Sequence, residues 1–168
     1  MRRLLVLASV IVFVDVAFFA AITPLLPHYV DELGLSRGEA GILTGSYAAG
    51  TFLASLPAGL LVVRAGHRAA VLSGLSLLGL ASLAFGLAES AAALDAARFG
   101  QGVGSALTWA GALSWLIDSA PADRRGELIG TAFGAAVAGA LFGPALGGLA
   151  ERVGTAPVFG SMVVVAAV

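Results

Sequence analysis

Long apolar runs, separated by short charged connections, restrict the fold of this chain more than any other feature. A membrane-crossing helix needs about 20 apolar residues to span a hydrocarbon core of roughly 30 Å. The runs lie at residues 4–27, 40–63, 69–88, 91–117, 128–150 and 155–168. The first five are long enough to cross, whereas the last is interrupted at Val168. The sequence therefore predicts an all-α, polytopic transmembrane bundle with five full spans and an incomplete sixth, as in part of a longer protein.

Composition supports a lipid environment. Of 168 residues, 59% are hydrophobic and 11% are charged, and the mean hydropathy is +0.99. Soluble domains carry about 25% charged residues, so a soluble globule of this size could not bury so much apolar surface. We predict that the lipid bilayer is the main partner of the chain, and that an uncleaved first span follows Arg2 and Arg3.

Several classes of function are disfavoured. The chain has no Lys, which excludes a P-loop lysine and a Schiff-base lysine, and it has no Cys. Its net charge of −1 gives no electrostatic footprint for nucleic acid. His28 and His67 lie in connections without metal-ligand spacing and are interpreted as plain loop residues. We therefore expect no enzyme, no cofactor, no metal site and no nucleic-acid partner.

The distribution of Arg predicts the orientation. The N-terminus and the second and fourth connections hold six Arg residues, whereas the first and fifth connections hold two. Positively charged connections favour the cytoplasmic side. We therefore predict a multi-pass protein with a cytoplasmic N-terminus.

One acid interrupts the first apolar run. Asp15 follows Leu4 by 11 residues, which places it about 17 Å along a helix and close to the bilayer midplane. A carboxylate at that depth is unfavourable and is expected to face the bundle interior or a wet cavity. Two interpretations stay open: Asp15 handles protons or cations, or it is a hydrogen-bonded acid that only orders helix packing.

The fourth run carries a polar stripe, defined as Arg98, Gln101, Ser105 and Thr108. Their spacing of three, four and three residues places them on one helix face. Arg98 would act as a fixed positive charge, since Arg does not deprotonate. Asp95, three residues earlier, is able to pair with Arg98 on the same face, and this pair near the interface is the alternative to a functional Arg98.

Small residues predict where helices approach closely. Gly139, Gly143 and Gly147 recur every four residues in the fifth run, as do Gly130 and Gly134. In lipid, such faces let a partner backbone come close. Gly41, Gly45 and Ala49 repeat the device in the second run, and Pro144 is expected to bend or soften the fifth helix.

Two segments then carry a resemblance to a known family. Residues 59–68 (GLLVVRAGHR) are similar to the cytoplasmic signature between helices two and three of major facilitator superfamily transporters. Gly59, Arg64, Gly66 and Arg68 match it, and Val63 replaces the usual acid. Residues 98–106 (RFGQGVGSA) resemble the fourth-helix signature of that family, whose Arg is associated with proton coupling.

Helix five gives the most specific match. The pattern typical of the family's antiporters is reproduced by Gly130, Gly139, Gly143, Pro144, Gly147 and Gly148. The family's cytoplasmic turn after helix four is matched by Asp118, Pro121 and residues 124–126. Asp15, which precedes the segment PLLP (24–27), is similar to the helix-one acid of the family's proton-linked drug exporters. The chain thus resembles, along essentially its whole length, the N-terminal six-helix half of such a transporter.

The resemblance implies a function and roles for particular residues. It implies proton-coupled efflux of small or drug-like molecules across the cell membrane by alternating access, with protons and a small-molecule substrate as partners. Asp15 and Arg98 would couple protons, and Gln101, Ser105 and Thr108 would line the cavity. A cytoplasmic gate would comprise Gly59, Arg64, Gly66, Arg68, Asp118, Arg124 and Arg125. Arg64, Arg68 and Asp118 would form an ion-pair cluster within it, and a missing C-terminal half would come from the same gene or a second copy.

Other interpretations remain open. A sugar or metabolite porter of the same superfamily is the nearest alternative. A structural membrane protein or transport-inactive remnant is another, supported by Val63 and the incomplete sixth span. A half-size transporter that homodimerises is a further possibility.

Overall fold

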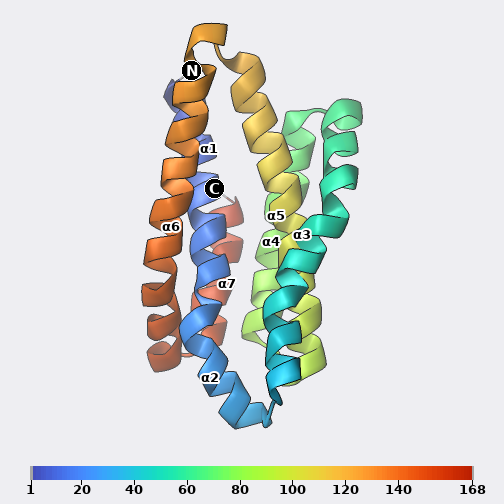
Figure 1. Cartoon of the computed structure of the whole chain (residues 1–168), viewed down its shortest axis with the longest axis vertical. Helices are drawn as coiled ribbons and strands as arrows, with labels where there is room; N and C mark the ends of the chain where they lie inside the picture. Colours follow the sequence, from blue (N-terminus) through green and yellow to red (C-terminus); the bar gives the residue numbers. More distant parts are fainter. Residues whose placement is uncertain (1, 168) are drawn as a thin grey trace.

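The computed structural model describes residues 2–167, and the surroundings of side chains up to residue 164. Within that range every regular element is a helix (Figure 1), as the sequence predicts. The elements are α1 (Arg2–Ala20), α2 (Ile22–Leu33), α3 (Arg37–Ala65), α4 (His67–Gly86), α5 (Ala91–Ser119), the 3₁₀-helix η1 (Ala122–Arg124), α6 (Arg125–Val153) and α7 (Thr155–Ala167).

The first predicted span differs from the structure in continuity and length. It is divided at Ala21 into α1 and α2, and it extends to Leu33 rather than ending at Pro27. Pro24 has no backbone N–H, so the carbonyl of Ala20 loses its helical partner at the break. The segment ends where Gly34 adopts φ 62° and its N–H donates to the Val30 carbonyl, a left-handed cap that glycine adopts readily.

Four segments of the described chain are long and apolar enough to cross a membrane: Arg2–Leu33, Arg37–Ala65, His67–Gly86 and Ala122–Val153. They correspond to the first, second, third and fifth predicted spans. The fourth predicted span coincides with α5, whose 29 residues reach about 44 Å at 1.5 Å per residue. α5 is too polar to be counted among these four segments. That α5 crosses the bilayer therefore stays a prediction. α7 comprises 13 residues within the described range.

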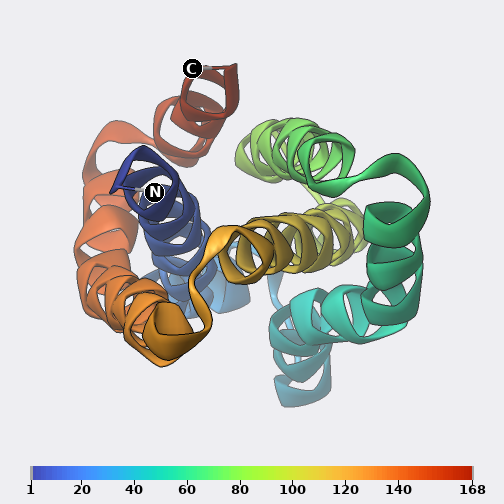
Figure 2. The ribbon, with the colours of Figure 1, turned by 90° about the horizontal axis from the view of Figure 1, so that it is seen from above.

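The helices pack in neighbouring groups that meet around α5. α5 lies against α3 and α4, α1 lies against α6, and α7 lies against α4. Viewed along the bundle, α5 occupies the middle of the assembly, between the α1–α6 pair and the α3–α4 pair (Figure 2). α1 also contacts α5. This contact brings the only acid of α1 within reach of the polar stripe.

The glycine face of α6 has the role that its spacing predicts. A Cβ on Gly139, Gly143 or Gly147 would collide with the backbone of α1 or with Ala21 after it; at Gly143 it would lie 2.7 Å from the Ala17 carbonyl oxygen. These three residues allow α6 to approach α1 to near backbone contact, which is how helices associate in lipid. α6 is a single helix through Pro144.

Other glycine predictions are wrong within the described chain. A Cβ on Gly130, Gly134, Gly41 or Gly45 would meet nothing within 4 Å. Their faces point away from the neighbouring helices, so regular spacing alone did not identify the packed face. The close approaches that the sequence analysis missed lie on α5, where Gly102 faces the Tyr47 carbonyl and Gly104 faces the α4 backbone at Leu78.

Candidate functional site

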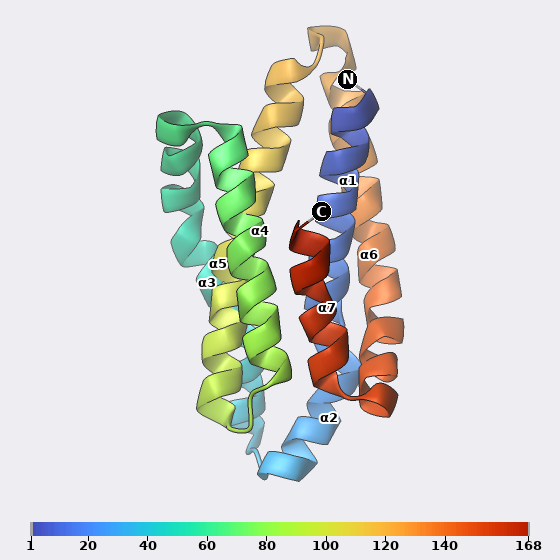
Figure 3. The same cartoon turned by 180° about the vertical axis from the view of Figure 1, so that it is seen from behind.

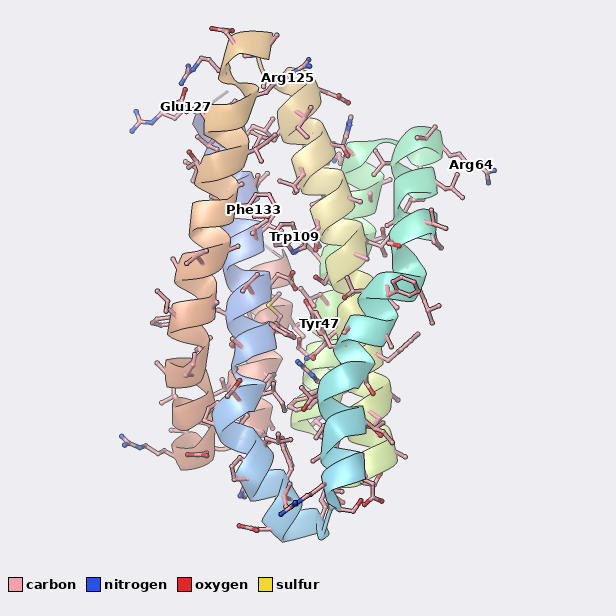
Figure 4. The ribbon with its side chains drawn as sticks, viewed as in Figure 1. Tyr47, Arg64, Trp109, Arg125, Glu127 and Phe133 are labelled. Atoms are coloured by element: carbon pink, nitrogen blue, oxygen red, sulfur yellow. The ribbon has the colours of Figure 1, made fainter. Side chains whose placement is uncertain are left out.

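Asp15 lies in the interior of the bundle and accepts hydrogen bonds from two other helices. Its side chain is 1% exposed. Oδ1 accepts a 3.1 Å hydrogen bond from the Tyr47 hydroxyl on α3. Oδ2 accepts from the Ser105 hydroxyl at 2.6 Å and from the Trp109 indole N–H at 2.7 Å, both on α5. The carboxyl group therefore joins α1 to α3 and α5. Figure 4 labels two of its partners, Tyr47 on α3 and Trp109 on α5.

Arg98 is fully buried on the same side of α5. One terminal nitrogen donates to Gln101 Oε1 at 3.0 Å, and Gln101 Nε2 donates onward to the Ser82 hydroxyl of α4 at 3.0 Å. The other terminal nitrogen donates a long 3.5 Å bond to the Phe19 carbonyl. Within residues 2–164 the Nε atom has no partner. The guanidinium is thus only partly satisfied by hydrogen bonds.

Tyr47 connects the buried acid to the buried cation. Its hydroxyl donates to Asp15, while the centroid of its ring is 4.9 Å from the guanidinium carbon of Arg98. The Phe19 ring lies 5.5 Å from the same carbon. A guanidinium over aromatic faces gains cation–π stabilisation, which is stronger in desolvated surroundings. We call Asp15, Tyr47, Arg98, Ser105 and Trp109 the acid–arginine cluster.

The structure brings the whole polar stripe into the interior. Arg98, Gln101, Ser105 and Thr108 are between 0% and 3% exposed. Ser105 reaches Asp15, whereas the Thr108 hydroxyl donates to the Ser105 carbonyl of its own helix. The stripe faces neighbouring helices in this chain, and its lining of a transport cavity stays a prediction.

Asp95 does not pair with Arg98, so the alternative of an interfacial Asp95–Arg98 pair is wrong. No ion pair joins Arg98 to either acid in the part of the chain that the structure describes. Asp95 Oδ1 is buried without a hydrogen-bond partner among the same residues. Arg98 instead donates to Gln101. The spacing of three residues places Asp95 and Arg98 on the same side of α5, but no ion pair forms between them.

Two further predictions, for His67 and for Asp118, are wrong at the end of the bundle near the N-terminus. His67 is no plain loop residue: its Nε2 lies 2.9 Å from Asp118 Oδ2, and its ring stacks on Trp115. Asp118 therefore pairs with His67 rather than with Arg64 and Arg68, both of which are exposed.

The remaining residues of the predicted gate lie at the same end. Arg124 forms a 2.9 Å ion pair with Glu127, and Arg125 is exposed (Figure 4). A Cβ on Gly59 would meet nothing within 4 Å. Gly66 has φ 85° between α3 and α4, a conformation that explains the glycine of the signature.

Sequence reasoning missed Tyr47, Trp109 and Ser82 as members of the site. Trp109 follows Ser105 by four residues and so shares its helix face, a signal that would have found it. No periodic signal marks Tyr47 or Ser82, because their roles depend on how α3 and α4 are placed against α5. Asp15 faces the interior of the bundle, as its depth predicts, and Arg98, Gln101 and Ser105 lie on one buried face of α5, as their spacing predicts.

Comparisons with known proteins identify the class of protein. Residues 8–168 match the family model described as Major Facilitator Superfamily. The chain therefore belongs to the major facilitator superfamily of membrane transporters, and its helices form a multi-pass bundle with the fold of an N-terminal half.

Individual relatives support the same assignment. The chain is 32% identical over 163 residues to the MFS-type transporter ppzB of Metarhizium majus, covering 93% of this chain and 36% of that protein. It is 34% identical over 154 residues to the multidrug resistance protein MdtG of Yersinia enterocolitica, covering 88% of this chain and 37% of that protein. The chain thus spans about a third of the length of these relatives.

A solved structure shows the same fold. The crystal structure of a bacterial homologue of the human lysosomal transporter Spinster, in an inward-facing and unoccupied conformation, superposes with a TM-score of 0.87 at 18% identity. The match covers 99% of this chain and 41% of that one.

Proposed function

We propose that this chain is one half of a proton-coupled exporter of small, drug-like molecules, operating in the cell membrane with its N-terminus in the cytoplasm. The single observation that carries the proposal is a buried carboxyl group, Asp15, held by three donors near a buried arginine. The name of a relative, multidrug resistance protein, supports drug-like molecules as the substrate class.

Asp15 has partners suited to both of its protonation states. The Trp109 N–H is a donor only, so Oδ2 stays an acceptor whether or not the acid is protonated. The Tyr47 hydroxyl both donates and accepts, so it is able to rotate and receive a proton carried on Oδ1. Protonation would then reverse the bond from α1 to α3 while the bonds from α1 to α5 persist.

Arg98 would act on Asp15 electrostatically, through its positive charge rather than through a direct contact. It keeps its charge at every working pH, and Tyr47 lies against both groups. A fixed positive charge in a low-dielectric interior favours a negative neighbour over a longer range than in water. A proton or a cationic substrate that arrives at Asp15 would change how strongly the acid holds its negative charge. In this way binding of one would affect binding of the other, as exchange requires.

The rest of the proposal follows the family architecture. Two pseudosymmetric halves would rock about a midplane site, with a C-terminal half from the same gene or a second copy completing the cavity. Gln101, Ser105 and Thr108 would line that cavity as the halves separate, and the close α1–α6 contact would limit leakage. The predicted gate residues at the end near the N-terminus would break and remake contacts during the cycle.

A transport assay tests the proposal. In proteoliposomes containing this chain with its C-terminal half, an imposed pH gradient is expected to drive movement of the dye ethidium against the proton flow. Collapse of the pH gradient with nigericin is expected to stop that movement. Equal dye flux with and without the gradient would refute proton coupling.

Removing one hydroxyl tests the α1–α3 bond. The Tyr47→Phe variant keeps the ring against Arg98 but loses the donor to Asp15. Hydrogen bonds to charged groups contribute about 1.5–3 kcal/mol, so we expect gradient-driven export to fall at least about tenfold. Thr44→Val is the matched control, because the Thr44 hydroxyl is exposed and bonds only its own helix. Wild-type transport by Tyr47→Phe would contradict this role of the hydroxyl.

A further inference from the structure

Of the three described donors to Asp15, only Trp109 reaches the surface of the bundle. Asp15 is 1% exposed, and Tyr47 and Ser105 are buried with it. Trp109 is partly exposed, although its indole N–H donates to Asp15 Oδ2 at 2.7 Å. One edge of the indole ring therefore contacts the acid, while another part of the same residue is accessible from outside.

Other helices cover the opposite side of the bundle. Seen from behind, α4 lies across α5, and α7 lies beside α1 (Figure 3). The rings of Phe18 on α1 and Phe159 on α7 pack edge to face with their centroids 5.7 Å apart, and both residues are buried. A route from outside to Asp15 is therefore expected on the side that carries Trp109.

A second aromatic ring holds Trp109 from the neighbouring helix. The centroid of the Phe133 ring on α6 lies 5.6 Å from that of Trp109 in a T-shaped arrangement, a favoured geometry for aromatic pairs. Both side chains lie between the α6 and α5 ribbons (Figure 4). α6 packs mainly on α1, whereas α5 packs mainly on α3 and α4. This contact thus joins two groups of helices, and a displacement of α6 from α5 would release the indole ring.

We propose that Trp109 is a movable cover over Asp15, and that a proton reaches the carboxyl group only when the indole ring turns outward. A hydrogen bond from N–H to a carboxylate is stronger than one to a neutral oxygen, so the ionised acid holds the cover most firmly. Once Asp15 carries a proton, the bond to the indole persists but is weaker, and the cover opens more readily. The cover itself follows from the geometry, whereas its use during export rests on the proposed function.

A single introduced cysteine tests the cover, because the chain contains no other. Ser105→Cys places a thiol where the Ser105 hydroxyl lies 2.6 Å from Asp15 Oδ2. Its reaction with hydroxyethyl methanethiosulfonate, a small uncharged thiol reagent, is followed by mass spectrometry of the purified chain in detergent. A covered group reacts only through transient openings, so we expect Trp109→Ala in this background to speed the reaction at least about tenfold.

Two matched comparisons separate a cover from a general loosening of the bundle. Phe133→Ala is expected to speed labelling about threefold through loss of one aromatic contact, whereas Phe142→Ala is expected to have no effect. Both phenylalanines are 50% exposed on α6, but Phe142 packs against Phe13 rather than Trp109. Trp109→Phe loses the N–H donor but keeps an aromatic ring, and it is expected to react more slowly than Trp109→Ala.

The inference is overturned if Trp109→Ala leaves the labelling rate unchanged, if Trp109→Phe reacts as fast as Trp109→Ala, or if Phe142→Ala speeds the reaction as much as Phe133→Ala. Dye export in proteoliposomes separates this result from the proposed function. Faster labelling with Trp109→Ala, in a transporter that shows no gradient-driven export, would support the cover and refute the exporter. Gradient-driven export together with an unchanged labelling rate would refute the cover alone.

Discussion

Replacing Asp15 with Asn is expected to abolish proton-driven export while the bundle stays folded. The amide oxygen of Asn is able to accept from Ser105 and Trp109, as Oδ2 does now. Its NH₂ group would then face Tyr47, whose hydroxyl is able to accept. The variant therefore imitates the protonated acid and cannot release the proton. Gradient-driven dye flux in proteoliposomes measures the loss.

A matched variant separates loss of coupling from loss of an acid. Asp31→Asn removes an exposed carboxyl group beyond the buried part of α2, and we expect it to transport like the wild type. Melting of both variants in detergent is expected to stay near that of the wild type. In Asp15→Asn the bonds from Ser105 and Trp109 keep their direction, and only the bond with Tyr47 is reversed. Undiminished pH-dependent export by Asp15→Asn would rule out this acid as the proton carrier.

Adding a single methyl group where α6 packs against the junction of α1 and α2 is expected to destabilise the whole bundle. A Cβ on Gly147 would collide with the Ala21 carbonyl and the Pro24 ring, whereas a Cβ on the adjacent Gly148 would meet nothing within 4 Å. Ala is a better helix former than Gly by about 1 kcal/mol. Overpacking against backbone costs about 1–3 kcal/mol, occasionally more, so Gly147→Ala is expected to lower stability.

The neighbouring glycine supplies the control with the opposite sign. Gly148→Ala gains helix propensity without a collision and is expected to match or exceed the wild-type melting temperature. Thermal unfolding in detergent, followed by size-exclusion chromatography for the fraction that stays monodisperse, measures both variants. If Gly147→Ala melts at or above the temperature of Gly148→Ala, the close contact of α6 with the junction of α1 and α2 does not contribute to the stability of the bundle.

Properties that depend on one helix at a time were predictable from the sequence. Apolar length gave the helices and approximate bounds, and the spacing of Arg98, Gln101 and Ser105 gave a face that is buried in the structure. Gly139, Gly143 and Gly147 were likewise identified as a contact face. Each of these signals follows from the helical period alone.

Properties that depend on the placement of one helix against another were not predictable. Tyr47 joins the cluster only because α3 lies against α5 at a register that the spacing within α3 does not encode. For the same reason, Gly41 and Gly45 were expected at a contact and point away from one. The break at Ala21 was missed because the absent N–H of Pro24 acts on a carbonyl four residues earlier.

Infrared difference spectroscopy of the Asp15 carboxyl group tests the central claim most directly. Spectra of the transporter, recorded as pH is varied with and without substrate, are compared with those of Asp15→Asn to assign the carbonyl band of the protonated acid. We predict a band that titrates reversibly, responds to substrate and is missing in the variant. A carboxyl group that keeps one protonation state at every pH, with or without substrate, would contradict the account and leave Asp15 as an element of helix packing.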